Sequence, residues 1–102
     1  MFELTKSHQA EDDLIDIWES TYRTWGEAQA ERYLDDIEAA MVNLARNPNI
    51  GKAREAIRPG YRSWQVKRHV IFYRTIDETL FIVRVLHDRM DPEVQMERSD
   101  EP

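Results

Sequence analysis

Hydrophobic residues follow a period of two in the second half of this chain. From Tyr61 onward, apolar and polar side chains alternate, and the runs VIFYRTI and TLFIVRVLH then follow on either side of Asp77-Glu78. Alternation of this kind is typical of a half-buried strand, and two runs rich in β-branched and aromatic residues around a polar pair are typical of a β-hairpin. The pattern therefore predicts three consecutive antiparallel strands in the middle of a sheet whose two faces are both partly covered.

Hydrophobic residues in the first half recur every three or four positions, which is the spacing of amphipathic helices. A short strand is predicted at residues 2–5, and Ser7 then caps the start of a first helix that ends near Gly26. The apolar stripe of this helix consists of Ala10, Leu14, Ile17, Trp18, Thr21, Tyr22 and Trp25. This stripe is expected to pack on the sheet.

A second helix is predicted from Glu27 to Arg46. The sequence Thr24-Trp25-Gly26-Glu27 matches a capping box at its start. The helix ends at Asn47-Pro48, because proline disfavours helical geometry in the residue before it. With so short a connection, the two helices form an antiparallel hairpin.

The order of these elements predicts an α+β fold, in which an N-terminal strand and an antiparallel helical hairpin pack on one face of a small, mainly antiparallel β-sheet. The connector after the helices has turn signals at Gly51 and Pro59-Gly60, with a brief edge strand at residues 55–57. The other face of the sheet carries polar and basic groups and is expected to be exposed. Residues 1–91 are expected to form a single domain, and residues 92–102 a polar, acidic tail that frays.

The composition argues against several classes of protein. The chain has no cysteine, so a disulfide framework or a thiolate zinc site is excluded. Its net charge of −6 argues against a generic nucleic-acid binder. No apolar run approaches the roughly 20 residues needed to span a bilayer, and the first residues lack the apolar stretch of a signal peptide. A cytoplasmic protein that contacts neither membrane nor nucleic acid directly is therefore expected.

The charge is distributed unevenly along the chain. Residues 1–50 hold 4 basic and 11 acidic residues, a balance of −7, whereas residues 51–90 hold 9 and 4, a balance of +5. Residues 91–102 hold 1 and 5, a balance of −4. Either these faces complement each other within the fold, or the basic sheet meets an acidic partner.

Several segments, in this order, resemble the ParE-type toxins of the RelE/ParE superfamily of bacterial toxin–antitoxin modules: DLIDIW, WGEAQAERYLDDI, LARNPNIGKAREAIRPGYR, RHVIFYR and VRVLHDRMD. The resemblance covers residues 2–91 and implies the helical hairpin and small antiparallel sheet described above. It also implies a cytosolic toxin that inhibits DNA gyrase. The implied partner is a ParD-like antitoxin, a ribbon-helix-helix dimer with a tail that wraps the toxin in a hetero-oligomer.

The RelE-like branch of the superfamily cleaves messenger RNA, which requires a base for the 2′-hydroxyl, a cation for the phosphate and an acid for the leaving oxygen. Here the middle-strand positions are Ser63, Trp64 and Gln65, and the last strand ends Leu86-His87-Asp88-Arg89, without the His-Tyr or Tyr of those enzymes. This departure favours a toxin with no catalytic residues and no cofactor. A RelE-like endoribonuclease and an inactive toxin retained as an interaction module are the alternatives.

Neither His69 nor His87 has a second histidine at metal-ligand spacing, so no metal site is predicted. For both residues a hydrogen-bonded structural role is the commoner outcome. Trp18, Tyr22 and Trp25 either pack in the core, or Trp25 is left exposed near the hairpin tip to anchor a partner.

The residues predicted to bind a partner are Trp25, Arg62, Trp64, Arg74, Arg84, His87 and Arg89. The arginine side chains either cover apolar surface with solvated heads, or bind carboxylates of the antitoxin or of gyrase. By alternation, Arg84 is expected to share a face with Ile82. The acidic stretch from Glu97 to Glu101 is expected to compete for the same basic surface.

Overall fold

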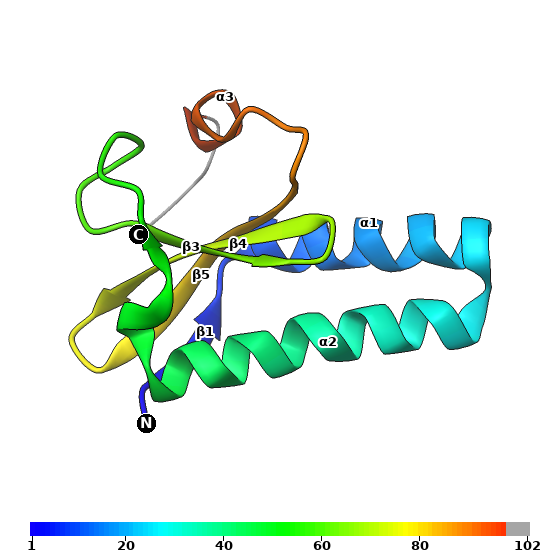
Figure 1. The fold of residues 1–102 in the computed structure, drawn as a ribbon, viewed down its shortest axis with the longest axis horizontal. Helices are drawn as coiled ribbons and strands as arrows, with labels where there is room; N and C mark the ends of the chain where they lie inside the picture. Colours follow the sequence, from blue (N-terminus) through cyan, green and yellow to red (C-terminus); the bar gives the residue numbers. More distant parts are fainter. Residues whose placement is uncertain (98–102) are drawn as a thin grey trace.

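The computed structural model describes residues 1–97, in which two long helices lie against a five-stranded sheet (Figure 1). The elements in order are β1 (Glu3–Lys6), α1 (His8–Trp25), α2 (Glu27–Arg46), the short 3-10 helix η1 (Pro48–Ile50), β2 (Lys52–Ala53), β3 (Arg62–Val66), β4 (His69–Ile76), β5 (Thr79–His87) and α3 (Pro92–Glu97). The predicted α+β class, with its N-terminal strand and helical hairpin, is confirmed.

The sheet has the strand order β1-β5-β4-β3-β2. Strand β1 pairs with β5 in parallel, and the other neighbours are antiparallel, so the three predicted central strands are confirmed. Each of the two tight turns between them begins with a residue in the left-handed region, Lys67 and Asp77, both with φ of 53°. Aspartate tolerates this region because its short side chain can hydrogen-bond locally.

Ser7 joins the start of α1 to the sheet. Its hydroxyl accepts a hydrogen bond from the backbone N–H of Ala10 at 2.9 Å and donates one to the carbonyl of Val83 at 2.7 Å. The first contact satisfies one of the free amides of the helix, as the sequence predicts. The second hydrogen bond holds the start of α1 against β5.

Gly26 alone separates α1 from α2. Its φ of 92° is a conformation that glycine adopts without steric cost, and its N–H donates to the carbonyl of Tyr22 at 2.8 Å. The predicted capping box at Thr24 is wrong, because α1 continues through Trp25 and no side chain caps α2. The predicted bounds of α2 are confirmed.

The main core lies between the helical hairpin and one face of the sheet. Its buried residues are Ala10, Leu14, Ile17, Tyr33, Ile37, Met41, Leu44, Ile71, Tyr73, Leu80, Ile82 and Val85. Of the stripe predicted for α1, only Ala10, Leu14 and Ile17 are buried. The aromatic residues of that stripe lie toward a different side of the helix.

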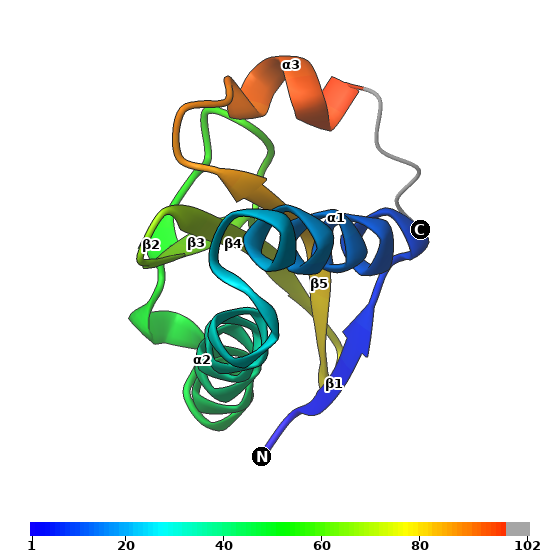
Figure 2. The same cartoon turned by 90° about the vertical axis from the view of Figure 1, so that its right-hand side faces the viewer.

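A second apolar cluster covers the opposite face of the sheet. It contains Tyr61, Phe72, Val83, Leu86 and Met96, and it lies under α3 and the connector before β3. Figures 1 and 2 show α3 and this connector on the side of the sheet away from α2. The predicted exposed, basic face is therefore wrong over this area.

The prediction of a frayed tail is wrong for residues 92–97, which form α3. Met96 is 2% exposed and supplies the apolar contact that holds this helix on the sheet. The sequence EVQME contains only two apolar residues, so a single buried methionine is easily missed in a polar segment. Residues 98–102 and the predicted role of their acidic side chains lie outside the described residues, as does the side chain of Glu97.

The edge strand of the connector is β2, three residues before the predicted position. Tyr73 explains this placement, because its hydroxyl accepts the N–H of Gly51 at 3.0 Å and donates to the carbonyl of Pro48 at 2.6 Å. A Cβ atom at Gly51 would overlap this hydroxyl, so the position requires glycine. Residues 54–60 form the loop, which the hydrogen bond from Arg54 N–H to the Tyr61 carbonyl closes at 2.8 Å.

None of the helices within residues 1–97 has the length and apolar character that crossing a membrane requires.

Candidate binding groove

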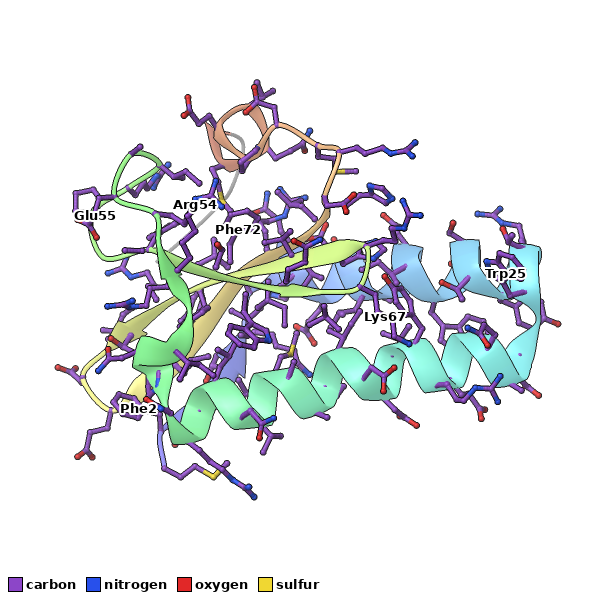
Figure 3. All side chains as sticks on the ribbon, viewed as in Figure 1. Phe2, Trp25, Arg54, Glu55, Lys67 and Phe72 are labelled. Atoms are coloured by element: carbon purple, nitrogen blue, oxygen red, sulfur yellow. The ribbon has the colours of Figure 1, made fainter. Side chains whose placement is uncertain are left out.

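A groove separates α1 from the β3–β4 turn and the end of β5. It consists of two adjoining hollows of about 420 Å³ each, which share Ser20, His69 and His87. The first is also lined by Thr21, Thr24, Trp25, Gln29, Tyr33, Lys67 and Arg68, and the second by Asp13, Asp16, Ile17, Arg84, Val85, Leu86, Met90 and Gln95. Figure 3 shows Trp25 at the tip of the helical hairpin and Lys67 at the β3–β4 turn.

A chain of hydrogen bonds crosses the floor of the first hollow. The backbone N–H of Arg68 donates to the Tyr33 hydroxyl at 3.2 Å, and this hydroxyl lies 2.6 Å from Nδ1 of His69. The direction of this second bond follows the tautomer of His69: the hydroxyl donates to a bare Nδ1 or accepts from a protonated one. The chain of hydrogen bonds joins α2 to the sheet.

Burial controls the charge of these two groups. It lowers the pKa of His69 from 6.5 to about 4, with repulsion from His87 adding to the effect and Asp88 and Asp13 opposing it. Burial likewise raises the pKa of Tyr33, against the hydrogen bond from Arg68. Both side chains are neutral near pH 7, which agrees with the hydrogen bond between them.

His87 ends β5 beside this chain. Its ring lies 5.2 Å from the ring of His69, edge to face. Nδ1 of His87 accepts the backbone N–H of Arg89 at 3.1 Å and is also 3.2 Å from a carboxylate oxygen of Asp88. One nitrogen cannot accept the first bond and donate the second at once, so the ring makes one of these two contacts at a time.

Arg84 is bound within the fold. Its guanidinium makes two bonds of 2.8 Å to the carboxylate of Asp13, and each side chain is 12% exposed. Asp13 also accepts the backbone N–H of Val85 at 2.9 Å, and Arg84 donates to the carbonyl of Gln95 at 3.4 Å. The hydrogen bonds to Asp13 raise the pKa of Arg84. This arginine therefore ties α1, β5 and α3 together.

A β-bulge accounts for the position of Arg84. Phe72 faces Arg84 across the strands and Tyr73 faces Ile82, so Val83 is an extra residue on β5. The predicted shared face of Arg84 and Ile82 is wrong, because the bulge interrupts the alternation between them.

The other predicted arginines are spread over the molecule. Arg62 donates to the carbonyl of Gly51 at 2.8 Å and to that of Asn49 at 3.4 Å, so it secures the connector. Arg74 is half-buried opposite Phe81. Arg89 is exposed just after β5. Arg62 lies on β3, Arg74 on β4 and Arg89 after the end of β5.

Trp64 is 38% exposed and lines a separate hollow of about 360 Å³ near β2. Of the predicted partner-binding residues, the groove thus contains Trp25, Arg84 and His87. Trp25 is 72% exposed, so the structure selects the exposed alternative for this residue.

The groove joins an exposed aromatic ring to positive charge. Lys67 lies 5.6 Å above the Tyr33 ring and pairs with Asp36 at 2.8 Å on the surface. The guanidinium of Arg68 makes no hydrogen bond or ion pair with any residue between 1 and 97. The groove therefore suits a segment that offers a carboxylate and an apolar surface. Within the same range, no group of three histidine, cysteine or acidic side chains could hold a metal ion.

Residues 4–92 match the family model described as "ParE toxin of type II toxin-antitoxin system, parDE". The chain belongs to the ParE toxin family. Curated relatives agree with this assignment: Toxin ParE1 of Mycobacterium tuberculosis strain H37Rv is 48% identical over 86 residues, which cover 83% of this chain and 88% of the relative.

More distant relatives of this ParE-family chain are also named as ParE toxins. Toxin ParE1 of Caulobacter vibrioides is 38% identical over 83% of this chain and 88% of its own length, and Toxin ParE of Escherichia coli is 33% identical over 81% and 82%. The solved structure "Chromosomal ParDE TA system from P. aeruginosa" superposes with a TM-score of 0.75, covering 85% of this chain and 96% of that chain at 22% identity. At that identity the match supports the fold alone.

Several groove residues of this ParE-family chain are missed by sequence reasoning. The exposure of Lys67 and Arg68 can be predicted from the sequence, because these two residues form the turn between two predicted strands. Nothing in the sequence pairs Tyr33 with His69, which lie 36 positions apart and belong to different predicted elements. Tyr33 also fits the apolar core stripe of α2, so the sequence gives no indication that its hydroxyl bonds to another element.

Proposed function

We propose that this chain is the toxin of a type II toxin–antitoxin module, that it stops growth by binding DNA gyrase, and that a ParD-like antitoxin neutralises it. The observation that carries the proposal is the family match over residues 4–92. The resemblance of the sequence motifs to ParE-type toxins supports gyrase, rather than the ribosome, as the target.

The hydrogen bonds of the charged residues in the groove support a toxin that acts by binding its target and not by cleaving RNA. RNA cleavage needs a base and a cation that reach the same phosphate. Arg84 shares a hollow with His87, but Asp13 neutralises it through two hydrogen bonds. His69 has its Nδ1 engaged by Tyr33 and, with a pKa of about 4, is a weak base. RelE-like cleavage stays the second candidate, since His87 does stand at the end of the last strand.

The antitoxin is proposed to occupy this groove with an extended or helical tail. Trp25 would insert into an apolar part of the tail, and Arg68 would bind a carboxylate next to it. His87 and Arg89 lie where the groove reaches the end of β5 and extend the same surface. Arg62, Trp64 and Arg74 would contact the antitoxin only if its tail continues around the sheet.

Expression without the antitoxin tests the function. Brief induction is expected to relax plasmid DNA or to induce the SOS response while primer extension on total RNA finds no new cleavage sites. Growth should recover when the small gene next to the toxin gene is co-expressed and encodes a ribbon-helix-helix protein. New RNA ends that precede any change in DNA topology would refute the proposal.

Calorimetry with that antitoxin tests the groove. Trp25→Ala is expected to weaken binding by about 2 kcal/mol, the size of an aromatic anchor, and Arg68→Glu by a similar amount. Arg46→Glu makes the same charge change on an exposed residue at the far end of α2 and should leave affinity nearly unchanged. Equal losses for Arg68→Glu and Arg46→Glu would contradict a role for the groove.

A further inference from the structure

Helix α1 has a second apolar stripe that the fold does not bury. Ile15 is 55% exposed, Tyr22 47% and Trp25 72%, and Trp18 is half-buried beside them. The rings of Trp18 and Tyr22 stack with centroids 5.0 Å apart and planes 18° from parallel. These are large side chains, and soluble monomers rarely leave such groups exposed next to one another unless the surface has a use.

The spacing of the stripe is that of a helix–helix seam. Ile15, Trp18, Tyr22 and Trp25 follow each other at intervals of three, four and three residues. This is the a/d pattern by which one helix packs its side chains between those of another. The four residues extend over about 15 Å of helix, and the helical hairpin that carries them projects beyond the sheet in Figure 1.

Acidic residues border the stripe. Asp12 and Glu19 lie three and four positions from Ile15, and Glu11 precedes it by four, so all three are its neighbours on the helix surface. Each is exposed, and none forms a side-chain hydrogen bond or ion pair with the rest of the described chain. The only basic residue of α1 is Arg23. The border therefore provides negative charge that the fold itself does not use.

We infer that this outer stripe of α1 is a docking surface for an amphipathic helix with basic flanks, supplied by a partner protein. The apolar face of that helix packs on Ile15, Trp18 and Tyr22, and its lysine or arginine side chains pair with Glu11, Asp12 and Glu19. A second copy of this chain suits the stripe less well, because two such helices would bring six of these carboxylates together with only two arginines. Trp25 also lines the groove, but Ile15, Trp18 and Tyr22 do not, so the contacts inferred for these three residues do not depend on the proposed antitoxin site.

Two labelled 21-residue peptides test the inference by fluorescence anisotropy. Both have leucine at the a and d positions, and they have either lysine or glutamate at the flanking positions. The lysine peptide is expected to bind at least tenfold more tightly than the glutamate peptide. The double variant Ile15→Ser/Tyr22→Ser should bind the lysine peptide at least tenfold more weakly than wild type. Its circular dichroism spectrum should show an intact fold, because neither side chain belongs to the core cluster.

Matched charge variants locate the contact. The double variant Asp12→Lys/Glu19→Lys is expected to bind the lysine peptide at least tenfold more weakly than wild type. Its control, Glu31→Lys/Asp35→Lys, makes the same charge change on exposed positions of α2 and should change the affinity less than threefold. Equal affinity for the two peptides, or equal losses in the two charge variants, would overturn the inference. Sedimentation would also overturn the inference if the wild-type chain were a dimer and Ile15→Ser/Tyr22→Ser a monomer, since a second copy would then occupy the stripe.

Discussion

Individual side chains of this toxin-family chain have unequal effects on stability, and the two kinds of ion pair illustrate this best. Arg84 and Asp13 are each 12% exposed and share two short hydrogen bonds. Lys67 and Asp36 are 54% and 49% exposed and share one contact of 2.8 Å. Removing one partner of a buried pair leaves a charge without water or counter-charge, whereas an exposed charge returns to solvent.

Arg84→Met is therefore expected to lower the free energy of unfolding by about 3–5 kcal/mol. Lys67→Met, its control, should lower it by no more than about 1 kcal/mol. Urea denaturation of the two variants provides the comparison. Similar losses in both would mean that the Arg84–Asp13 pair is less important to the fold than its burial implies.

His69 should make stability depend on pH. Its pKa is 6.5 ordinarily and about 4 in the fold, so the unfolded chain binds the proton first as pH falls. The stability that neutral His69 contributes is complete above pH 6.5 and is lost as pH falls from 6.5 towards 4, at no more than about 1.4 kcal/mol per pH unit. Urea midpoints measured across this range should show a smaller slope for His69→Gln than for wild type.

His8 provides the control for that experiment, because it is exposed at the start of α1. His8→Gln should keep the wild-type slope. A His69→Gln variant with the same pH dependence as wild type would show that His69 is not the group that titrates. The groups that face its ring, Tyr33, His87 and Asp88, are unchanged in both variants.

At the scale of the elements, α3 is a short helix with one buried apolar side chain. It has six residues, and Met96 is the side chain that joins it to the second apolar cluster. Met96→Ala is expected to lower the free energy of unfolding by about 2 kcal/mol, at the low end for a buried methionine because a short helix can detach without unfolding the sheet. Val94→Ala, at a position 44% exposed, should have little effect.

Hydrogen exchange can follow α3 directly. In Met96→Ala the amides of residues 92–97 should exchange faster, while those of β4 and β5 keep their protection. Equal acceleration throughout the sheet would mean that α3 belongs to the same cooperative unit as the central strands.

Elements with a strong local pattern could be predicted from sequence, and those that depend on distant contacts could not. Helix α2 begins and ends where its stripe and Pro48 predict, and the β4–β5 hairpin turns at Asp77-Glu78. The bulge at Val83 has no local signal, because it falls in the apolar run of residues 80–83, where one extra residue leaves the pattern unchanged. The outer stripe of α1 is missed for a similar reason: its residues fit the same helical spacing as the core stripe.

At the scale of the whole molecule, the uneven charge has two explanations that apply to different residues. Part of it is complementary within the fold, since Arg84, Lys67 and Lys6 pair with acidic side chains of α1 and α2. Other charges form no side-chain bond within the described residues and stay available to partners: Arg68 in the groove, and the acidic border of α1 on another side. The sequence could predict the imbalance but not which charges the fold uses.

The central claim is that the chain acts by binding gyrase and breaks no bond itself. The most direct measurement adds the purified chain to purified gyrase with relaxed plasmid and follows supercoiling. Supercoiling is expected to fall as the chain is titrated, with DNA breaks that require gyrase, and messenger RNA in a translating extract should stay intact. Unimpaired supercoiling together with RNA cut by the same preparation would contradict the account.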